Sequence, residues 1–339
     1  MLALKIPKNK ADFIRRILLK HSLIDLDFKI KRSDEYVYIP ILKKPDNEVL
    51  REYDKDFEVV YQSFDAYRKR PTSLKGYLKD VVEQDVILEI KKSFDIIGDV
   101  VILEIPEDLE SLKYKIADAA LKFTKRKSVY RKSSEIKGVM RTRTLEHLAG
   151  EDQSETLHTE YGSRLLLDVR KVYFSPRLAT ERERIVEQVS DGEVIVDLFA
   201  GVGPFSVNIA RQKTVEIYAV DINPHAIYYL KRNMKLNKMK GMIIPVLGDA
   251  HQFLSEKDVN ADRIIMNLPG TACKYLEEAI NSLKVGGTLH YYEFSSDYQN
   301  PIKRIKEASR KRDVTILNKR KVKSSSPGTW HMGIDACIN

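Results

Sequence analysis

The sequence has very few cysteines and no long hydrophobic run. Its two cysteines, Cys273 and Cys337, lie far apart and form no C-x-x-C motif, which argues against a disulfide framework and against a zinc site built on thiolates. No apolar stretch approaches the roughly 20 residues that cross a bilayer, and the N-terminus shows no secretion signal. We therefore expect a cytoplasmic protein with no structural metal and no membrane partner.

Positive charge is in excess along the chain. The 339 residues contain 58 Lys and Arg against 49 Asp and Glu, which gives a net charge of +9. Such an excess favours a polyanionic partner, although a protein can also be basic without one. Apolar residues make up 43% of the chain, which is enough for the cores of two or three domains.

Residues 1–66 predict a small N-terminal α/β domain. Its predicted helix carries apolar side chains at helical spacing, at Phe13, Ile14, Ile17 and Leu18. Residues 36–39 predict a strand. Residues 67–81 begin with a basic stretch that holds a proline and a glycine, so we expect a linker there. A flexible linker would let the N-terminal domain move relative to the rest of the chain.

Residues 82–168 predict a second, RNA-binding domain. Within it, residues 96–105 predict a strand, and residues 107–122 predict a helix with one apolar face. Residues 122–143 then hold nine Lys or Arg against one acid, with Phe123 and Tyr130 between the charges. Because basic side chains neutralise phosphates and aromatic rings stack on bases, this stretch indicates contact with RNA; a solvated charged face is the alternative.

Residues 169–339 predict a larger α/β domain. Five short apolar runs are expected to be strands: 194–198, 217–221, 242–247, 263–267 and 287–293. Helices are expected to begin near Pro204, Pro224 and Thr271. This alternation is typical of a parallel sheet with helices on both faces. Residues 303–323 hold ten Lys or Arg against two acids, which makes this tail a second candidate contact for a polyanion.

A glycine-rich turn between two apolar runs predicts a nucleotide site. The first run leads through Asp197 into Gly201-Val202-Gly203-Pro204, and the second ends at Asp221, 20 positions after Gly201. Glycines let the backbone approach a ligand closely, and a carboxylate at this place can accept hydrogen bonds from ribose hydroxyls. Pro204 breaks the G-x-G-x-x-G pattern, which favours a ligand without a pyrophosphate, such as S-adenosylmethionine.

Other site residues are expected at the carboxyl ends of the same strands. Asp249 is placed to meet the adenine amino group, although a helix cap is the alternative for any one of these acids. The expected cofactor-binding residues are Phe199, Ala200, Gly201, Val202, Asp221, Ile222, Asp249, Ala250 and Asn267. Amino-directed methyltransferases carry Asn or Asp before Pro at the fourth strand end, where the amide can hold a flipped base. Asn267-Leu268-Pro269 fits that pattern, with a simple turn as the alternative.

Two further stretches identify a family. They are residues 141–151, RTRTLEHLAGE, and residues 171–182, KVYFSPRLATER. Together with residues 197–205, 221–225, 267–269 and 290–292, they resemble the archaeal and eukaryotic tRNA (guanine-37 N1)-methyltransferases. The resemblance covers nearly the whole chain and is loose over the first 65 or so residues. It implies a Rossmann-fold class I methyltransferase domain preceded by RNA-binding segments, with S-adenosylmethionine as methyl donor.

The resemblance also implies roles for individual residues. Glu181 matches the family's proposed general base for the proton on the guanine ring nitrogen, a role that a raised pKa would assist. Arg141 matches the residue that stabilises negative charge on the guanine oxygen. Tyr173 matches a residue beside the target nucleotide, and Asn267 with Pro269 the pair that holds the base. Arg182 matches a position at the methyl-donor pocket.

Three other functions stay open from the sequence. One is the related aminocarboxypropyl transfer of wybutosine synthesis, although that family is understood to lack the Asn-x-Pro motif present here. Another is additional methylation of a tricyclic wyosine precursor. The third is a tRNA-binding protein without catalytic activity, against which the intact Asp221, Asn267 and Glu181 argue. For the methyltransferase we expect a monomer that binds the anticodon arm, with the N-terminal domain touching a distant part of the tRNA.

Overall fold

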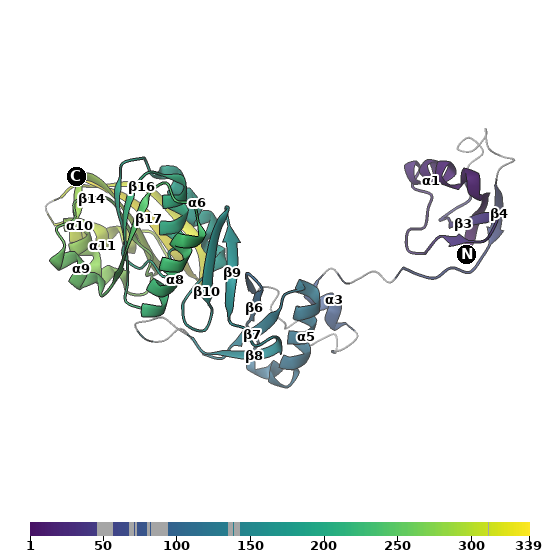
Figure 1. The fold of residues 1–339 in the computed structure, drawn as a ribbon, viewed down its shortest axis with the longest axis horizontal. Coiled ribbons are helices and arrows are strands. Elements are labelled where there is room, and N and C mark those ends of the chain that lie inside the picture. The colour runs from purple at the N-terminus through teal and green to yellow at the C-terminus, as the bar shows by residue number, and fades with distance from the viewer. Residues whose placement is uncertain are drawn as a thin grey trace. The chain divides into compact units, whose positions relative to one another are not determined.

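The computed structural model describes residues 1–45, 57–67, 71, 73–79, 82, 94–134, 138, 143–310 and 312–339. They form two compact units, residues 1–72 and 73–339, each with helical structure packed against β-sheet (Figure 1). The finer division into domains at residues 66, 81 and 168 stays a prediction. Within the described residues, no helix is long and apolar enough to cross a membrane.

The first unit is a four-stranded antiparallel sheet covered by one helix. The sheet has the order β2-β3-β1-β4, with strands β1 (Leu2–Pro7), β2 (Lys31–Arg32), β3 (Tyr36–Pro40) and β4 (Glu58–Tyr61). Helix α1 (Ala11–Lys20) follows the 3₁₀ helix η1 (Lys8–Lys10) and buries Ile14 and Leu18 in the core of the unit. The predicted helix and strand are therefore confirmed. Phe13 instead lies on the outer side of α1, 51% exposed.

The second unit begins with another four-stranded sheet. Its order is β5-β6-β7-β8, with strands β5 (Asp95–Ile97), β6 (Val100–Leu103), β7 (Ser128–Lys132) and β8 (Leu145–Gly150). Helices α3 (Leu74–Leu78) and α5 (Lys113–Thr124) bury apolar side chains together with those of β6 and β7.

Two sequence predictions for this sheet were wrong in detail. Residues 96–105 do not form one strand, because Gly98 adopts a φ of +53° and turns the chain back, so that β5 and β6 pair as an antiparallel hairpin. The predicted helix 107–122 is α-helical only from Lys113, because Glu107–Leu112 form the 3₁₀ helix η3.

A two-stranded hairpin links this sheet to the large one. Strands β9 (Glu155–Glu160) and β10 (Ser163–Asp168) pair antiparallel. The amide of Asn233, on helix α8 (Pro224–Leu236), binds both the N–H and the carbonyl of Leu166. Asn237 binds Arg164 in the same way. Side-chain amides that replace a missing strand partner thus fix the hairpin against α8.

The large sheet has seven strands in the order β13-β12-β11-β14-β15-β17-β16. The strands are β11 (Val194–Asp197), β12 (Glu216–Asp221), β13 (Met242–Leu247), β14 (Ala261–Met266), β15 (Leu283–Ser295), β16 (Val314–Ser326) and β17 (Thr329–Ile338). The first five in this order run parallel, as predicted, whereas β17 is antiparallel to both of its neighbours. Strand order reverses between β12 and β14 at β11, which is where ligands bind in such sheets.

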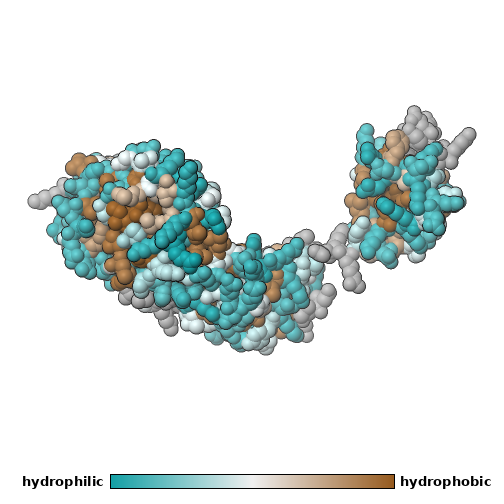
Figure 2. All heavy atoms as spheres, in the orientation of Figure 1, coloured by the Kyte–Doolittle hydropathy of each residue, from teal (hydrophilic) through white to brown (hydrophobic). Residues whose placement is uncertain are grey.

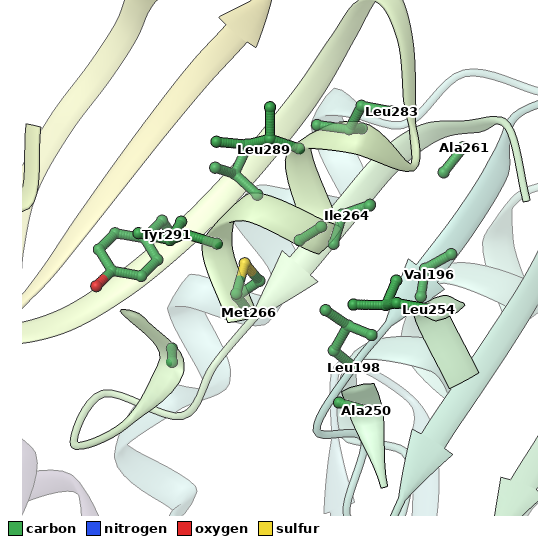
Figure 3. Packing of buried hydrophobic residues seen from close by; sticks show 14 of the residues in the cluster. Val196, Leu198, Ala250, Leu254, Ala261, Ile264, Met266, Leu283, Leu289 and Tyr291 are labelled. Carbon is green, nitrogen blue, oxygen red and sulfur yellow. The ribbon is translucent and has the colours of Figure 1, made fainter. Parts of the chain in front are cut away.

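Helices cover both faces of this sheet. Three pack on one face: α6 (Ala179–Gln188), which follows the 3₁₀ helix η4 (Pro176–Leu178), α7 (Pro204–Gln212) and α8. Three pack on the other: α9 (Ala250–Glu256), α10 (Leu276–Asn281), which follows η5 (Ala272–Tyr275), and α11 (Gln299–Ser309). Figure 3 shows this second core, where Leu254 of α9 lies beside Val196 of β11, and Ile264 and Leu289 lie on the adjacent strands β14 and β15. Helix starts at Pro204 and Pro224 are confirmed.

The basic tail forms regular structure that its charge pattern did not predict. Residues 303–309 belong to α11, and residues 314–326 form the edge strand β16. Strand β17 then inserts between β15 and β16. Much of the surface in view is hydrophilic, with hydrophobic side chains gathered over the part that holds the large sheet (Figure 2).

Candidate active site

A cavity opens at the carboxyl ends of the central parallel strands. Residues after β11, β12, β13 and β14 line it, which is the sheet edge predicted for the ligand. Eleven of the predicted residues are among its lining: Tyr173, Arg182, Phe199, Ala200, Gly201, Asp221, Ile222, Asp249, Ala250, Asn267 and Pro269. The sequence-predicted donor site and base-holding motif therefore share one cavity.

The glycine turn is tied to the second strand by a carboxylate. Asp221 Oδ2 accepts a hydrogen bond from the N–H of Gly201 at 2.7 Å, and Oδ1 accepts one from the N–H of Asn223 at 2.8 Å. Gly201 has a φ of +56°, and a Cβ there would meet only the carbonyl of Tyr173, at 3.9 Å. The turn thus presents bare backbone to the cavity, with the Asp221 carboxylate beside it.

The two acids behind this turn share an apolar environment. Burial raises the pKa of Asp197 to about 7, although a hydrogen bond from the Ser206 hydroxyl at 2.7 Å acts to lower it. Burial likewise raises the pKa of Asp221, while the N–H groups of Asn223 and Gly201 act in the opposite direction. A polar or cationic ligand beside Asp221 would compensate for this burial.

Asp249 has the helix-cap role that the sequence left open as an alternative. Its side chain accepts from the N–H of His251 at 2.8 Å and begins α9. Asp249 and Ala250 nevertheless line the cavity. A carboxylate retains further lone pairs after one such bond, so capping and ligand binding are compatible.

The Asn267-Leu268-Pro269 segment closes one side of the cavity. The carbonyl of Pro269 accepts a hydrogen bond from the N–H of Phe294 at 3.2 Å, which fixes the segment to β15. Tyr173 and Phe294 line the cavity with it. Aromatic rings and a side-chain amide at one mouth are suited to holding a planar base.

A second cavity adjoins the first and is strongly basic. It lies between the β5–β8 sheet and the large sheet, and Tyr173, Phe174 and Ser175 line both cavities. Four cationic side chains line the second: Lys132, Arg143, Arg177 and Lys323. Asp95 pairs with Arg177 at 2.6 Å, and burial lowers the pKa of Lys132. Half-buried cations with one acid among them favour an anionic ligand.

Arg182 reaches the first cavity from a buried ion pair. Its Nε and Nη2 bind the two carboxylate oxygens of Glu160 at 2.6 and 2.5 Å, and the guanidinium lies over the ring of Phe174, 5.1 Å from its centroid. Burial alone would raise the pKa of Glu160, but His158 and Arg182 lower it to about 2. Glu160 therefore keeps the charge that holds Arg182 in place.

Glu181 lies behind the cavity wall. It is 7% exposed and is absent from the lining of either cavity, whereas its neighbours Leu178 and Arg182 line the first. Burial alone would raise its pKa, but hydrogen bonds from Arg320 and Arg184 lower it. The raised pKa that would assist a general base is therefore not found in this structure. The role of Glu181 stays a prediction.

One predicted site residue lies elsewhere, and another falls outside the part of the chain that the structure describes. Val202 is fully buried, packs in a core with Ala226 and Tyr229, and does not line the first cavity. Its carbonyl accepts from Asn233 at 2.9 Å, so this position supports the turn from behind. Arg141 lies outside the described residues.

Several cavity residues were not predicted from the sequence. They are Ser175, Tyr275, Phe294, Lys323 and His331. Ser175 lies in the family stretch around Tyr173, which could have indicated it as a cavity residue. The charge of the tail had pointed to Lys323 only as an RNA contact. His331 gave no signal, because only the pairing of β17 with β15 brings it to the cavity.

The chain is similar to known proteins over its full length. A family model described as the TRM5/TYW2 methyltransferase domain matches residues 156–317, and models of the TYW2 N-terminal domain and of the tRNA methyltransferase 5 N-terminal domain match residues 74–153 and 3–49. The chain is 42% identical to tRNA (guanine(37)-N(1))-methyltransferase Trm5b of Methanocaldococcus jannaschii, covering 100% of this chain and 99% of the relative.

A solved complex and a second relative extend the comparison. The protein in a complex of aTrm5 with tRNALeu has a TM-score of 0.85 and 40% identity to this chain, over 100% of both chains. A tRNA(Phe) (4-demethylwyosine(37)-C(7)) aminocarboxypropyltransferase of the same Methanocaldococcus species is 37% identical, over 71% of this chain and 95% of the relative. The second relative lacks a counterpart to more than a quarter of this chain.

Proposed function

Because the chain belongs to the TRM5/TYW2 methyltransferase family, and within it to the tRNA (guanine-37 N1)-methyltransferases, we infer that it methylates N1 of guanine 37 in tRNA. The observation that carries this function is 42% identity along the whole chain, both small N-terminal segments included. The methyl donor is S-adenosylmethionine, which supplies an electrophilic methyl group when bound. The enzyme binds tRNA as its substrate.

The first cavity fits this donor. Asp221 can accept the ribose hydroxyls with the lone pairs that Gly201 and Asn223 leave open, and the bare backbone at Gly201 leaves room beside it. We propose that Phe199 and Ile222 pack against the donor and that Asp249 and Ala250 meet its adenine. These residues all line the cavity.

The target base is proposed to lie where the two cavities meet. Asn267 and Pro269 would hold its edge, and Tyr173, which lines both cavities, would pack beside it. The cationic residues of the second cavity would receive the phosphates that flank a flipped nucleotide. Positioning two reactants in this way supplies a large part of the rate in a displacement reaction.

Glu181 is proposed to accept the proton from guanine N1, and Arg141 to stabilise charge on the guanine oxygen. For Glu181 this requires its carboxylate to turn from its arginine partners toward the cavity, because Glu181 is not among the residues that line it. Guanine is uncharged before and after methylation, and Glu181 becomes neutral when it accepts the proton. The charges balance because the sulfonium of the donor would lose its positive charge and leave as a neutral thioether. The role of Arg141 rests on the family alone.

The finer partner assignments are also proposals. We propose that the basic segment around Lys132 and the cationic strand β16 hold the anticodon arm, that the first unit contacts a distant part of the tRNA, and that the protein acts as a monomer. The cytoplasmic location expected from the sequence stays a prediction.

The test is single-turnover methyl transfer to two unmodified tRNA transcripts, one with guanine and one with adenine at position 37, with mass spectrometry of the product nucleosides. We expect 1-methylguanosine from the first transcript only. Methylation of neither transcript by protein that binds the donor would favour aminocarboxypropyl transfer or a premodified wyosine substrate. Failure to bind the donor would favour a tRNA-binding protein without catalytic activity.

A further inference from the structure

The carboxylate of Glu181 is held by a buried set of donors from two other elements of the fold. Arg320, on strand β16, donates to both of its oxygens, with Nε at 3.0 and 2.9 Å, and its Nη2 also binds Oε1. Arg184, one turn along α6, donates at 2.8 and 3.1 Å. The hydroxyl of Tyr292, on β15, donates at 2.5 Å. Both oxygens are therefore fixed.

The two arginines are themselves held by one buried acid. Asp335, on β17 and 1% exposed, accepts from Arg184 at 2.7 and 3.3 Å and from Arg320 at 3.0 and 3.2 Å. Each guanidinium thus bridges Asp335 and Glu181. Two carboxylates and two guanidiniums alternate, so the charges balance within the cluster.

A buried histidine anchors Asp335 from the far side. His290 Nδ1 lies 2.6 Å from Asp335 Oδ1, and its Nε2 lies 2.6 Å from Arg263 Nη1. Because a guanidinium can only donate, Nε2 accepts and the proton lies on Nδ1, which donates to Asp335. Burial lowers the pKa of His290, so the ring stays neutral. Arg263 in turn donates from its Nε to the carboxylate of Glu193 at 2.7 Å.

Irregular pairing of strand β16 accompanies the inward position of Arg320 beside Glu181. Irregularities in its pairing with β17 lie on both sides of the residue, between Ile316 and Asn318 and between Lys321 and Lys323. Arg320 pairs across the strands with Gly333, where a Cβ would come within 3.0 Å of the guanidinium. Because Gly333 has no side chain, it leaves room for the guanidinium of Arg320 opposite it.

We propose that Arg320 is a positioning residue for methyl transfer: oriented by Asp335, it keeps the Glu181 carboxylate ionised and oriented behind the cavity wall, from where the carboxylate turns toward the cavity to accept the guanine proton. This proposal rests on the function proposed above for Glu181. It assigns to β16, a strand that the charge pattern marked only as an RNA contact, a role beneath the cavity. Arg184 shares the task from α6.

The pH dependence of the reaction separates this role from a structural one. The groups that face Glu181 are Arg184, Arg320 and Tyr292, with Asp335 behind the arginines. The pKa of Asp335 is lowered despite its burial, by His290 and the arginines, and burial raises that of Tyr292 well above its usual value. Neither therefore titrates near neutral pH. Without Arg320, burial would raise the pKa of Glu181, and only Arg184 and the hydrogen bond from the Tyr292 hydroxyl would oppose that rise.

The experiment measures single-turnover methyl transfer at saturating donor and tRNA, from about pH 5.5 to 8, for the wild type and Arg320→Met. In the wild type, the rate is not expected to fall toward acid pH through protonation of Glu181, because its pKa is lowered. The variant is expected to acquire an acid limb, losing about tenfold in rate for each pH unit below the new pKa, and to recover as the pH rises. A purely structural role would lower the rate by the same factor at every pH.

The control is Lys319→Met on the same strand. Lys319 lies over the ring of Tyr298, 5.7 Å from its centroid, so this variant removes an equal charge without touching the cluster. We expect weaker tRNA binding and no acid limb. Gly333→Ala is a second route, because its Cβ displaces the Arg320 guanidinium while the charge stays; it should give an acid limb like that of Arg320→Met.

The outcomes distinguish the two proposals. If Glu181→Gln slows the reaction but Arg320→Met keeps the wild-type pH profile, the positioning role is refuted and the role of Glu181 stands. If Glu181→Gln reacts at the wild-type rate, Glu181 is not the proton acceptor and both proposals fail. If Arg320→Met does not fold, the two single variants Arg320→Lys and Gly333→Ala take its place. A wild-type dependence of the rate on pH in both of them would overturn the inference.

Discussion

The ion pair behind the first cavity should contribute strongly to the stability of the second unit at neutral pH. Glu160 and Arg182 have side chains 3% and 2% exposed, and Asn208 donates to the same carboxylate at 2.8 Å. Glu160→Gln removes the charge while it preserves the shape. Because Arg182 then stays buried with no anion beside it, the substitution is expected to be costly.

The magnitude can be worked from the pKa of Glu160. A fall from 4.5 in the unfolded chain to about 2 in the folded protein corresponds to about 3 kcal/mol, at about 1.4 kcal/mol for each pKa unit. Breaking a buried pair by removal of one partner costs roughly 3–5 kcal/mol in other proteins, which agrees. The folded pKa is depressed, so this stability is present above pH 4.5 and is lost as the pH falls toward 2. About 2 kcal/mol of it should be lost between about pH 7 and pH 3.

The assay uses the only tryptophan, Trp330, which lies in β17 and therefore reports on the large sheet. Unfolding by guanidinium chloride, followed by its fluorescence, is compared for the wild type and Glu160→Gln at both pH values. The same change at Glu187, exposed on α6, is the control and should cost less than about 0.5 kcal/mol. A difference between wild type and Glu160→Gln that stays constant from pH 7 to pH 3 would refute the reasoning.

Two further substitutions test the cavity and its turn. Gly203→Ala should lower the melting temperature more than the control Gly286→Ala does. Both glycines have φ near +80°, so the backbone strain is similar in the two variants. A Cβ at Gly203 would also lie 2.3 Å from Leu230 Cδ1, whereas nothing lies within 4 Å of a Cβ at Gly286. Equal melting temperatures would contradict this view of the turn. Asp221→Ala should weaken S-adenosylmethionine binding at least about tenfold in calorimetry, because it removes the ribose acceptor and leaves the N–H of Gly201 without its partner. Unchanged affinity would place the ribose elsewhere.

Local patterns were sufficient for the parallel part of the large sheet. Each of its five strands was predicted within a few residues, because buried strands are continuous apolar runs and Pro204 and Pro224 mark helix starts. The position of the first cavity followed from the same topology, since parallel strands end at one edge. Where local geometry overrode the pattern, as at Gly98, one residue with positive φ was enough to split a predicted strand.

What the sequence by itself determined was therefore the identity of the family, the order of the parallel elements and the acids at their ends. Only the tertiary structure decided what surrounds Glu181. Its partner Arg320 is 139 positions away in the chain, in the tail of residues 303–323, whose charge suggested contact with a polyanion. Asp335, which holds Arg320, lies 154 positions from Glu181 and beyond that tail. The physical reason is that a charge run has no period that marks an inward-facing residue. Arg320 turns inward only because β17 inserts beside β16 and presents Gly333 opposite it.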